Sequence, residues 1–206
     1  MNTTNKVAWA VFAILAIVIG LYPLLYFFLD REFGLLASKE DVLLSNVFWN
    51  IGFYGHILFG GLALLVGWVQ FSKRLRNANL KRHRVIGRIY IISAMISGVC
   101  AVYIALYATG GVISTLGFMS LGFLWLFFTS RAYLAIRKGD LPLHQGLMIY
   151  SYAACFAAVT LRIWLPLLTI IFHDFTLAYR IVAWLCWVPN IIFAFFWVRR
   201  RGLQLG

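Results

Sequence analysis

Residues 52–88 read GFYGHILFGGLALLVGWVQFSKRLRNANLKRHRVIGR, and this stretch decides the fold. No residue from Phe48 to Phe71 is charged, and at about 1.5 Å of rise per residue the span can cross a hydrocarbon layer about 30 Å thick as a helix. Seven basic residues and no acidic residue follow between Ser72 and Arg88. Because short loops rich in Lys and Arg stay in the cytoplasm, the pattern predicts a transmembrane helix whose C-terminal end faces the cytoplasm.

The whole chain has the composition of a multi-span membrane protein. Of its 206 residues, 63% are hydrophobic and 12% are charged, whereas soluble domains average about 45–50% apolar and about 25% charged residues. The length allows about six spans and no separate soluble domain. The expected spans are residues 7–29, 47–71, 87–108, 112–136, 145–171 and 179–198. We therefore predict an all-α bundle of six membrane helices that forms one transmembrane domain, with both termini in the cytoplasm.

The net charge of +12 is distributed unevenly along this topology. Basic residues gather in segments expected in the cytoplasm, and most acidic residues, including Asp30 and Glu32, lie in segments expected outside. This distribution predicts how the chain is oriented in the membrane and that its cytoplasmic face contacts anionic lipids. It argues against a nucleic-acid-binding surface. The three cysteines lie far apart within apolar spans, so neither a disulfide framework nor a zinc site is indicated.

His56 is an ionisable side chain within the second span, where such a group needs a partner or a function. Gly52 and Gly60 lie one helical turn before and after it on the same face. In one interpretation these glycines leave space for a haem against the backbone, with His56 as an axial ligand of the iron. In the other, the glycines let a second helix approach closely and His56 forms a hydrogen bond across the interface. Both interpretations remain open.

Arg162 lies well within the fifth span and cannot lose its charge by giving up a proton. It is a candidate clamp for a carboxylate, such as a haem propionate, or for an anionic substrate. Alternatively, its side chain extends toward the membrane surface or pairs with Asp174 near the outer end of the span.

A second group of candidates lies where the basic loops meet the membrane. His83 and His144 are expected at similar depth on different helices and could together bind a haem iron, another metal or a quinone head group. Arg88, one turn after Arg84, would suit a propionate or a head group. The alternative for His83 and the arginines is contact with lipid head groups at the cytoplasmic surface.

Several of these residues belong to short sequence patterns. The patterns are Gly55-His56-Ile57-x-x-Gly60, Gln70-Phe71 before the basic loop, His83-Arg84-x-x-Gly87-Arg88, Gly139-Asp140-x-x-x-His144 and Thr160-Leu161-Arg162. Together they resemble a family of predicted bacterial multi-span membrane proteins of unknown function. The resemblance covers residues 46–168 and implies a multi-pass protein of the bacterial cytoplasmic (inner) membrane, but no activity.

A looser similarity is to six-helix cytochromes of the b561 type, which implies haems held by histidines on the four central helices. The chain departs from that pattern because no second span histidine is expected at the depth of His56. One haem or a quinone pocket is therefore a better expectation than two haems.

Three functions remain in view. The first is an electron-transfer subunit that binds b-type haem or quinone through His56, His83 or His144, with Arg162 or Arg88 as clamps. The second is a non-catalytic accessory or assembly subunit of a larger membrane complex, in which these residues tie helices together. The third is a small-anion transporter that uses Arg162. No pattern of nucleophile and base, phosphate loop or metal-binding motif names a reaction, so no catalytic residue is assigned.

Overall fold

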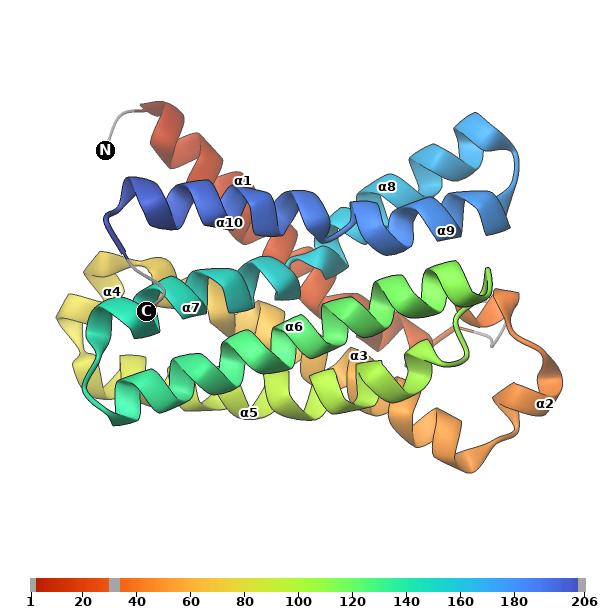
Figure 1. The fold of residues 1–206 in the computed structure, drawn as a ribbon, viewed down its shortest axis with the longest axis horizontal. Coiled ribbons are helices and arrows are strands. Elements are labelled where there is room, and N and C mark those ends of the chain that lie inside the picture. The colour runs from red at the N-terminus through yellow and green to blue at the C-terminus, as the bar shows by residue number, and fades with distance from the viewer. Residues whose placement is uncertain (1–2, 30–33, 204–206) are drawn as a thin grey trace.

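The computed structural model describes residues 3–29 and 34–203, and within them it contains helices and no β-strand. Six helical segments in these ranges are long and apolar enough to cross a membrane, which confirms the predicted fold class (Figure 1). These segments are Lys6–Phe27, Val47–Phe71, Leu80–Ala105, Val112–Arg137, Leu141–Phe172 and Phe175–Arg200. Large apolar side chains such as Phe48 (75% exposed) and Val112 (73% exposed) surround the bundle and face the lipid. Asp30 and Glu32, predicted to lie outside, fall beyond the described residues.

Each span is built from one or two helices. In chain order the helices are α1 (Thr3–Leu21), η1 (Tyr22–Phe27), η2 (Leu36–Ser38), α2 (Asp41–Leu44), α3 (Val47–Gly67), η3 (Trp68–Phe71), α4 (Lys73–Ala78), α5 (Leu80–Ala105), α6 (Val112–Arg137), α7 (Leu141–Cys155), α8 (Ala157–Phe172), α9 (Phe175–Leu185) and α10 (Val188–Arg200). We call the end of the bundle with α4 and the α6–α7 turn the basic end. The opposite end, where α2 lies, is called the strap end, because residues 34–39 cross it (Figure 1).

The third and fifth spans begin earlier than their apolar runs predicted. The α5 helix starts at Leu80 rather than Gly87, because the Asn79 side chain accepts a hydrogen bond from the backbone of Arg82. The α7 helix starts at Leu141 because Asp140 caps it through the backbone N–H of Leu143. An apolar run therefore marks where lipid contact begins, whereas the cap marks where the helix begins. His83 and His144 consequently lie in helices.

The fifth and sixth spans are both interrupted near their middles. The break between α7 and α8 falls at Phe156, and the break between α9 and α10 falls just before Pro189, which occupies the first turn of α10. The Asn190 amide donates to the carbonyls of Cys186 (3.0 Å) and Ala153 (3.3 Å). The two breaks thus lie next to each other, and the Asn190 side chain bonds to backbone carbonyls that the interrupted helices leave free. Backbone groups within a bilayer need such partners, because no water is present there.

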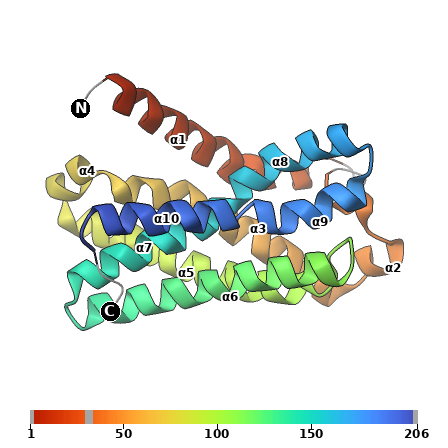
Figure 2. The same ribbon diagram turned by 45° about the horizontal axis from the view of Figure 1, so that its top comes forward.

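Small residues set how closely the helices approach. A Cβ atom on Gly61 of α3 would lie 2.6 Å from the backbone oxygen of Gly20 in α1, and one on Gly67 would lie 2.3 Å from the ring of Tyr152 in α7. Such close crossings are typical of membrane helices. From its crossing with α3, α1 diverges from the bundle toward its N-terminus (Figure 2).

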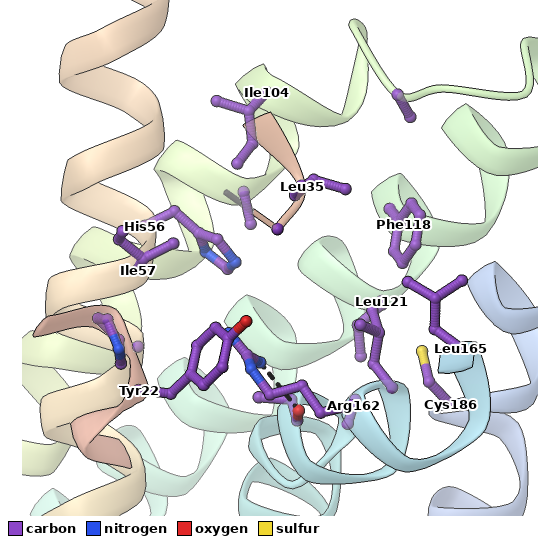
Figure 3. Close-up of a pocket in the computed structure, with 18 of the residues that line it drawn as sticks. Tyr22, Leu35, His56, Ile57, Ile104, Phe118, Leu121, Arg162, Leu165 and Cys186 are labelled. Atoms are coloured by element: carbon purple, nitrogen blue, oxygen red, sulfur yellow. Dashed lines mark hydrogen bonds between the residues drawn. The ribbon is translucent and has the colours of Figure 1, made fainter. Parts of the chain in front are cut away.

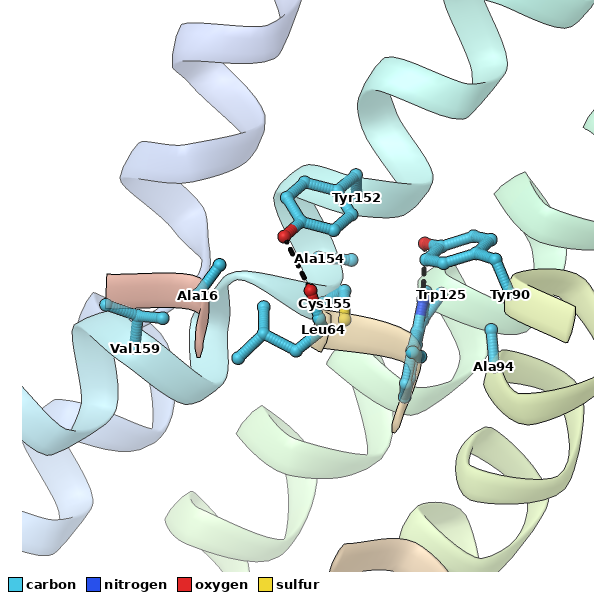
Figure 4. Packing of buried hydrophobic residues seen from close by; sticks show 10 residues of the cluster. Ala16, Leu64, Tyr90, Ala94, Trp125, Tyr152, Ala154, Cys155 and Val159 are labelled. Carbon is cyan, nitrogen blue, oxygen red and sulfur yellow. Dashed lines mark hydrogen bonds between the residues drawn. The ribbon is translucent and has the colours of Figure 1, made fainter. Parts of the chain in front are cut away.

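A closed ring of hydrogen bonds holds the centre of the bundle, and Figure 4 shows one of these bonds, between Trp125 and Tyr90. Thr129 donates its only hydroxyl hydrogen to the Trp125 carbonyl (2.7 Å), so Ser151 must donate to Thr129 (2.7 Å) and Tyr90 to Ser151 (2.7 Å). The indole N–H of Trp125 donates to Tyr90 (3.4 Å). The network therefore starts and ends on Trp125 and orients the Trp125 ring.

Candidate functional site

A cavity of about 750 Å³ lies inside the bundle toward the strap end, and its wall is mainly apolar. Residues of all six spans line it, including Trp125 of the closed ring. His56 from α3 and Arg162 from α8 enter the same space (Figure 3). The structure thus brings together two side chains that the sequence singled out on separate spans.

The hydrogen bonds of His56 determine which ring nitrogen carries the proton. Its Nδ1 lies 3.2 Å from the backbone oxygen of Ser97, which can only accept. The Ser97 hydroxyl donates to the backbone oxygen of His56 (2.8 Å), so its 3.0 Å contact with Nδ1 must also be donated by the imidazole. A neutral His56 therefore carries its hydrogen on Nδ1 and keeps the lone pair on Nε2, and the ring faces the cavity (Figure 3).

The glycines beside His56 serve helix packing against α5. A Cβ on Gly52 would lie 2.7 Å from the ring of Tyr103, and one on Gly60 would lie 2.9 Å from the Ser97 hydroxyl. The α5 side chains therefore fill the space next to a Cβ position on each glycine, as the helix-packing interpretation expects. Gly60 and His56 also line the cavity, and a haem held by His56 stays a prediction.

Arg162 has few partners for a buried cation. Its Nη1 donates to the Ala158 carbonyl (2.9 Å), and its guanidinium carbon lies 4.4 Å from the centre of the Tyr22 ring. Its Nε is buried without a hydrogen-bond partner. Asp174, the predicted alternative partner, instead caps α9 through the backbone of Leu177 (3.0 Å). Within residues 3–29 and 34–203 no ion pair neutralises Arg162.

A second buried donor lies in the cavity wall. The indole N–H of Trp49, a residue only 2% exposed, also has no hydrogen-bond partner. Together with Arg162 it makes the wall rich in donors, while Nε2 of His56 contributes one acceptor. Such a wall suits a ligand whose polar groups are mainly oxygen acceptors.

The inner candidates lie apart from this cavity, at the basic end. Nδ1 of His144 bonds to the backbone oxygen of Ala132 (2.8 Å), and His83 is close enough for its charge to interact with that of His144. Arg88 is exposed. In the described ranges no cluster of three or more His, Cys, Asp or Glu side chains is arranged to hold a metal ion. A shared ligand at His83, His144 and Arg88 stays a prediction.

Sequence reasoning missed Tyr22, Trp49 and Lys39 as parts of this site. The first two read as ordinary aromatic residues near span ends, and Lys39 reads as a solvated loop residue. In the structure, the Lys39 ammonium donates to the Tyr107 carbonyl and to the Thr109 hydroxyl (2.9 Å), and the residue lines the cavity. Burial lowers the pKa of Lys39 from 10.5 to about 8.

We expect Lys39→Met to remove part of a pH dependence of stability. The native pKa of Lys39 is about 8 and its ordinary value is 10.5, so between these pH values the unfolded chain binds more protons than the folded protein. The free energy of unfolding should therefore rise as the pH increases through this window. Melting temperatures in detergent from pH 7 to pH 10.5 test this, with a smaller rise expected for Lys39→Met. Equal slopes in both proteins would show that Lys39 titrates as a solvated amine.

Comparison with known proteins identifies the family. Searches of curated proteins and of solved structures find no match, and nothing found supports the looser similarity to b561-type cytochromes. A family model described as a predicted membrane protein (DUF2306) matches residues 53–198. This segment contains His56 and Arg162, extends through the sixth span and omits Tyr22 and Lys39. The chain belongs to this family of predicted membrane proteins, whose function is unknown.

Proposed function

We propose that the protein binds a quinone in the cavity and acts as a subunit in membrane electron transfer. The observation that carries the proposal is that the cavity wall holds both His56, whose Nδ1 is bonded to Ser97 and whose ring faces the cavity, and an Arg162 that has no acidic partner within residues 3–29 and 34–203. A quinone presents carbonyl oxygens that an Arg can bind, and the hydroxyl of the reduced quinol can donate to Nε2. The apolar wall suits the ring.

The exchange between quinone and quinol involves two electrons and two protons. His56 is suited to hold a proton beside the head group, because its Nε2 accepts while Nδ1 stays bound to Ser97. We propose that the electrons come from, or go to, another subunit of a membrane complex. We also propose that the basic end faces the cytoplasm of a bacterial inner membrane and contacts anionic lipids there.

A b-type haem is the second candidate. Histidines that bind metals usually donate their other ring N–H to a carbonyl or carboxylate, as Nδ1 of His56 does. Arg162 would then hold a propionate. The quinone is favoured because, among the described residues, His56 is the only histidine in the cavity wall, so a haem there would have one histidine ligand.

A third candidate function, small-anion transport, is supported only by the position of the helix breaks. The breaks in the fifth and sixth spans lie near Arg162, and transporters often bind anions where helices are interrupted. Both breaks fall in the C-terminal half of the chain, however, whereas inverted-repeat transporters have them at corresponding places in two halves. The accessory-subunit function requires only the helix contacts already described.

The deciding experiment combines quinone analysis with visible spectroscopy. The protein, purified in mild detergent, is expected to bind decylubiquinone and to show no haem band in its reduced-minus-oxidised spectrum. His56→Ala should weaken binding of the reduced form, decylubiquinol, about tenfold, because the quinol hydroxyl donates to Nε2, a buried hydrogen bond is worth about 0.5–1.5 kcal/mol, and its loss leaves that hydroxyl unpaired. His173→Ala, in the exposed turn before α9, is the matched control and should bind normally.

Two other outcomes of this experiment would contradict the quinone proposal. A haem band that disappears in His56→Ala but persists in His173→Ala would establish the haem function instead. A colourless protein that binds no quinone would overturn both and favour the accessory-subunit function.

A further inference from the structure

One wall of the cavity runs along α8 from the interior to the outer surface of the bundle. Arg162, Pro166 and Ile170 line it and are spaced four residues apart, which places them on one face of the helix. Exposure increases along this face: Arg162 is partly buried, whereas Ile170 is 67% exposed although it lines the cavity. The cavity therefore reaches the lipid-facing surface at this wall.

The facing wall is η1, at the end of the first span. Tyr22 lies against the Arg162 guanidinium, and Tyr26 lines the cavity farther toward the strap end. A Cβ on Gly34 would lie 2.8 Å from the Tyr26 hydroxyl, so the start of the strap packs directly on η1. The contact of Arg162 with Tyr22 thus lies at the inner end of the gap between α8 and η1, and the cavity continues beyond it to His56 and Leu121.

The strap covers the route from the aqueous side. Ser38 bonds to the Thr109 hydroxyl (3.1 Å), and the ammonium of Lys39 bonds to the same hydroxyl, which ties the strap to the α5–α6 turn. Leu36 is only 3% exposed, and the backbone of Leu35 donates to the Tyr26 hydroxyl (3.4 Å). Because residues 34–39 are tied to that end, among the described residues the exposed part of the wall at Pro166 and Ile170 provides the route into the cavity.

We infer that the cavity opens sideways into the bilayer between η1 and α8, and that its ligand is a lipid-soluble molecule whose apolar tail lies in this opening. The head-group part of this inference rests on the proposed function: the polar end reaches His56 and Arg162, and the tail passes Ile170. A quinone with an alkyl or isoprenoid tail has this chemistry. The acyl chain of a membrane lipid could occupy the same opening, so the experiment must separate the two.

The test uses two neighbouring isoleucines. Ile170 and Ile171 are 67% and 66% exposed, but only Ile170 lines the cavity. Ile170→Trp should fill the opening, and Ile171→Trp is its matched control. The probes are decylubiquinone and the same benzoquinone head group without a tail. Ile170→Trp should weaken decylubiquinone binding about tenfold or more and leave the tail-less probe within about twofold, whereas Ile171→Trp should alter neither.

A second measurement does not depend on quinone binding. In vesicles containing a phosphatidylcholine with a photoreactive acyl chain, the partly buried Leu121 of α6, which lines the cavity, should be labelled. Ile170→Trp should remove that label and Ile171→Trp should keep it. A labelled Leu121 without quinone binding would retain the opening and overturn the quinone proposal, with an acyl chain as the occupant. An unlabelled Leu121, or equal effects of Ile170→Trp on both quinone probes, would overturn the sideways opening.

Discussion

Arg162→Met is expected to raise the melting temperature of the ligand-free protein while weakening quinone binding at least about tenfold. A charged side chain within the membrane costs about 2.5–3.5 kcal/mol, and the bond to Ala158 and the Tyr22 ring offset part of this for Arg162. We expect a net stabilisation of about 1–2 kcal/mol, which corresponds to a rise of roughly 2–8 °C for a protein of this size. Binding weakens because a charge-assisted hydrogen bond is worth about 1.5–3 kcal/mol.

The opposite signs of these two effects distinguish a binding residue from a structural one. Arg180, whose Nε donates to the Gly110 carbonyl (2.8 Å) and which is absent from the cavity wall, supplies the control variant Arg180→Met. That change should leave quinone binding unaltered and should not raise the melting temperature. If Arg162→Met instead lowers the melting temperature by several degrees, Arg162 holds the bundle together, and the accessory-subunit function gains support.

Gly61→Ala is expected to lower the melting temperature by roughly 5–10 °C, because overpacking costs about 1–3 kcal/mol and here the obstacle is backbone. The added Cβ would lie 2.6 Å from the Gly20 backbone oxygen and 3.0 Å from Pro23. Neither can move like the end of a flexible side chain, so α1 and η1 must shift away from α3. Tyr22 would move with them and lose its position against Arg162.

Gly87→Ala is the matched control for this change. It is the same substitution within a helix, but its Cβ would lie 3.6 Å from the Gln70 side chain, an ordinary contact. Because Ala is favoured over Gly by about 0.8–1.0 kcal/mol in a helix, Gly87→Ala should be neutral or stabilising. Thermal unfolding in one detergent compares the two variants. A melting temperature for Gly61→Ala within a degree of wild type would mean that α1 does not pack on α3 as the structure places it.

The helix boundaries depend on two kinds of local sequence signal, the apolar runs and the capping residues. The apolar runs placed all six spans, but the third and fifth helices begin earlier because Asn79 and Asp140 cap them. Those caps are visible in the sequence and could have been used. The interruption at Phe156 has no comparable local signal, because its free backbone groups are satisfied by Asn190 from the next span.

Some residues of the candidate site can be identified from the sequence, and others only from the structure. His56 and Arg162 could be selected from sequence alone, since an ionisable group in an apolar span is costly wherever it points. Lys39 and Trp49 could not, because a lysine in a loop and a tryptophan near a span end are ordinary. Only the strap and the packing of α3 give Lys39 a lowered pKa and leave the indole N–H of Trp49 buried without a partner.

By itself, the sequence determined that this protein is a six-span membrane bundle, because apolar composition and run length depend only on transfer of the chain into lipid. The tertiary structure decided that the glycines beside His56 pack against α5, that His56 faces a cavity, and that Arg162 shares this cavity without an acidic partner among the residues that the structure describes. The physical reason is that these properties depend on which atoms of distant spans meet. The sequence periodicity of a single helix does not indicate which other helices pack against it.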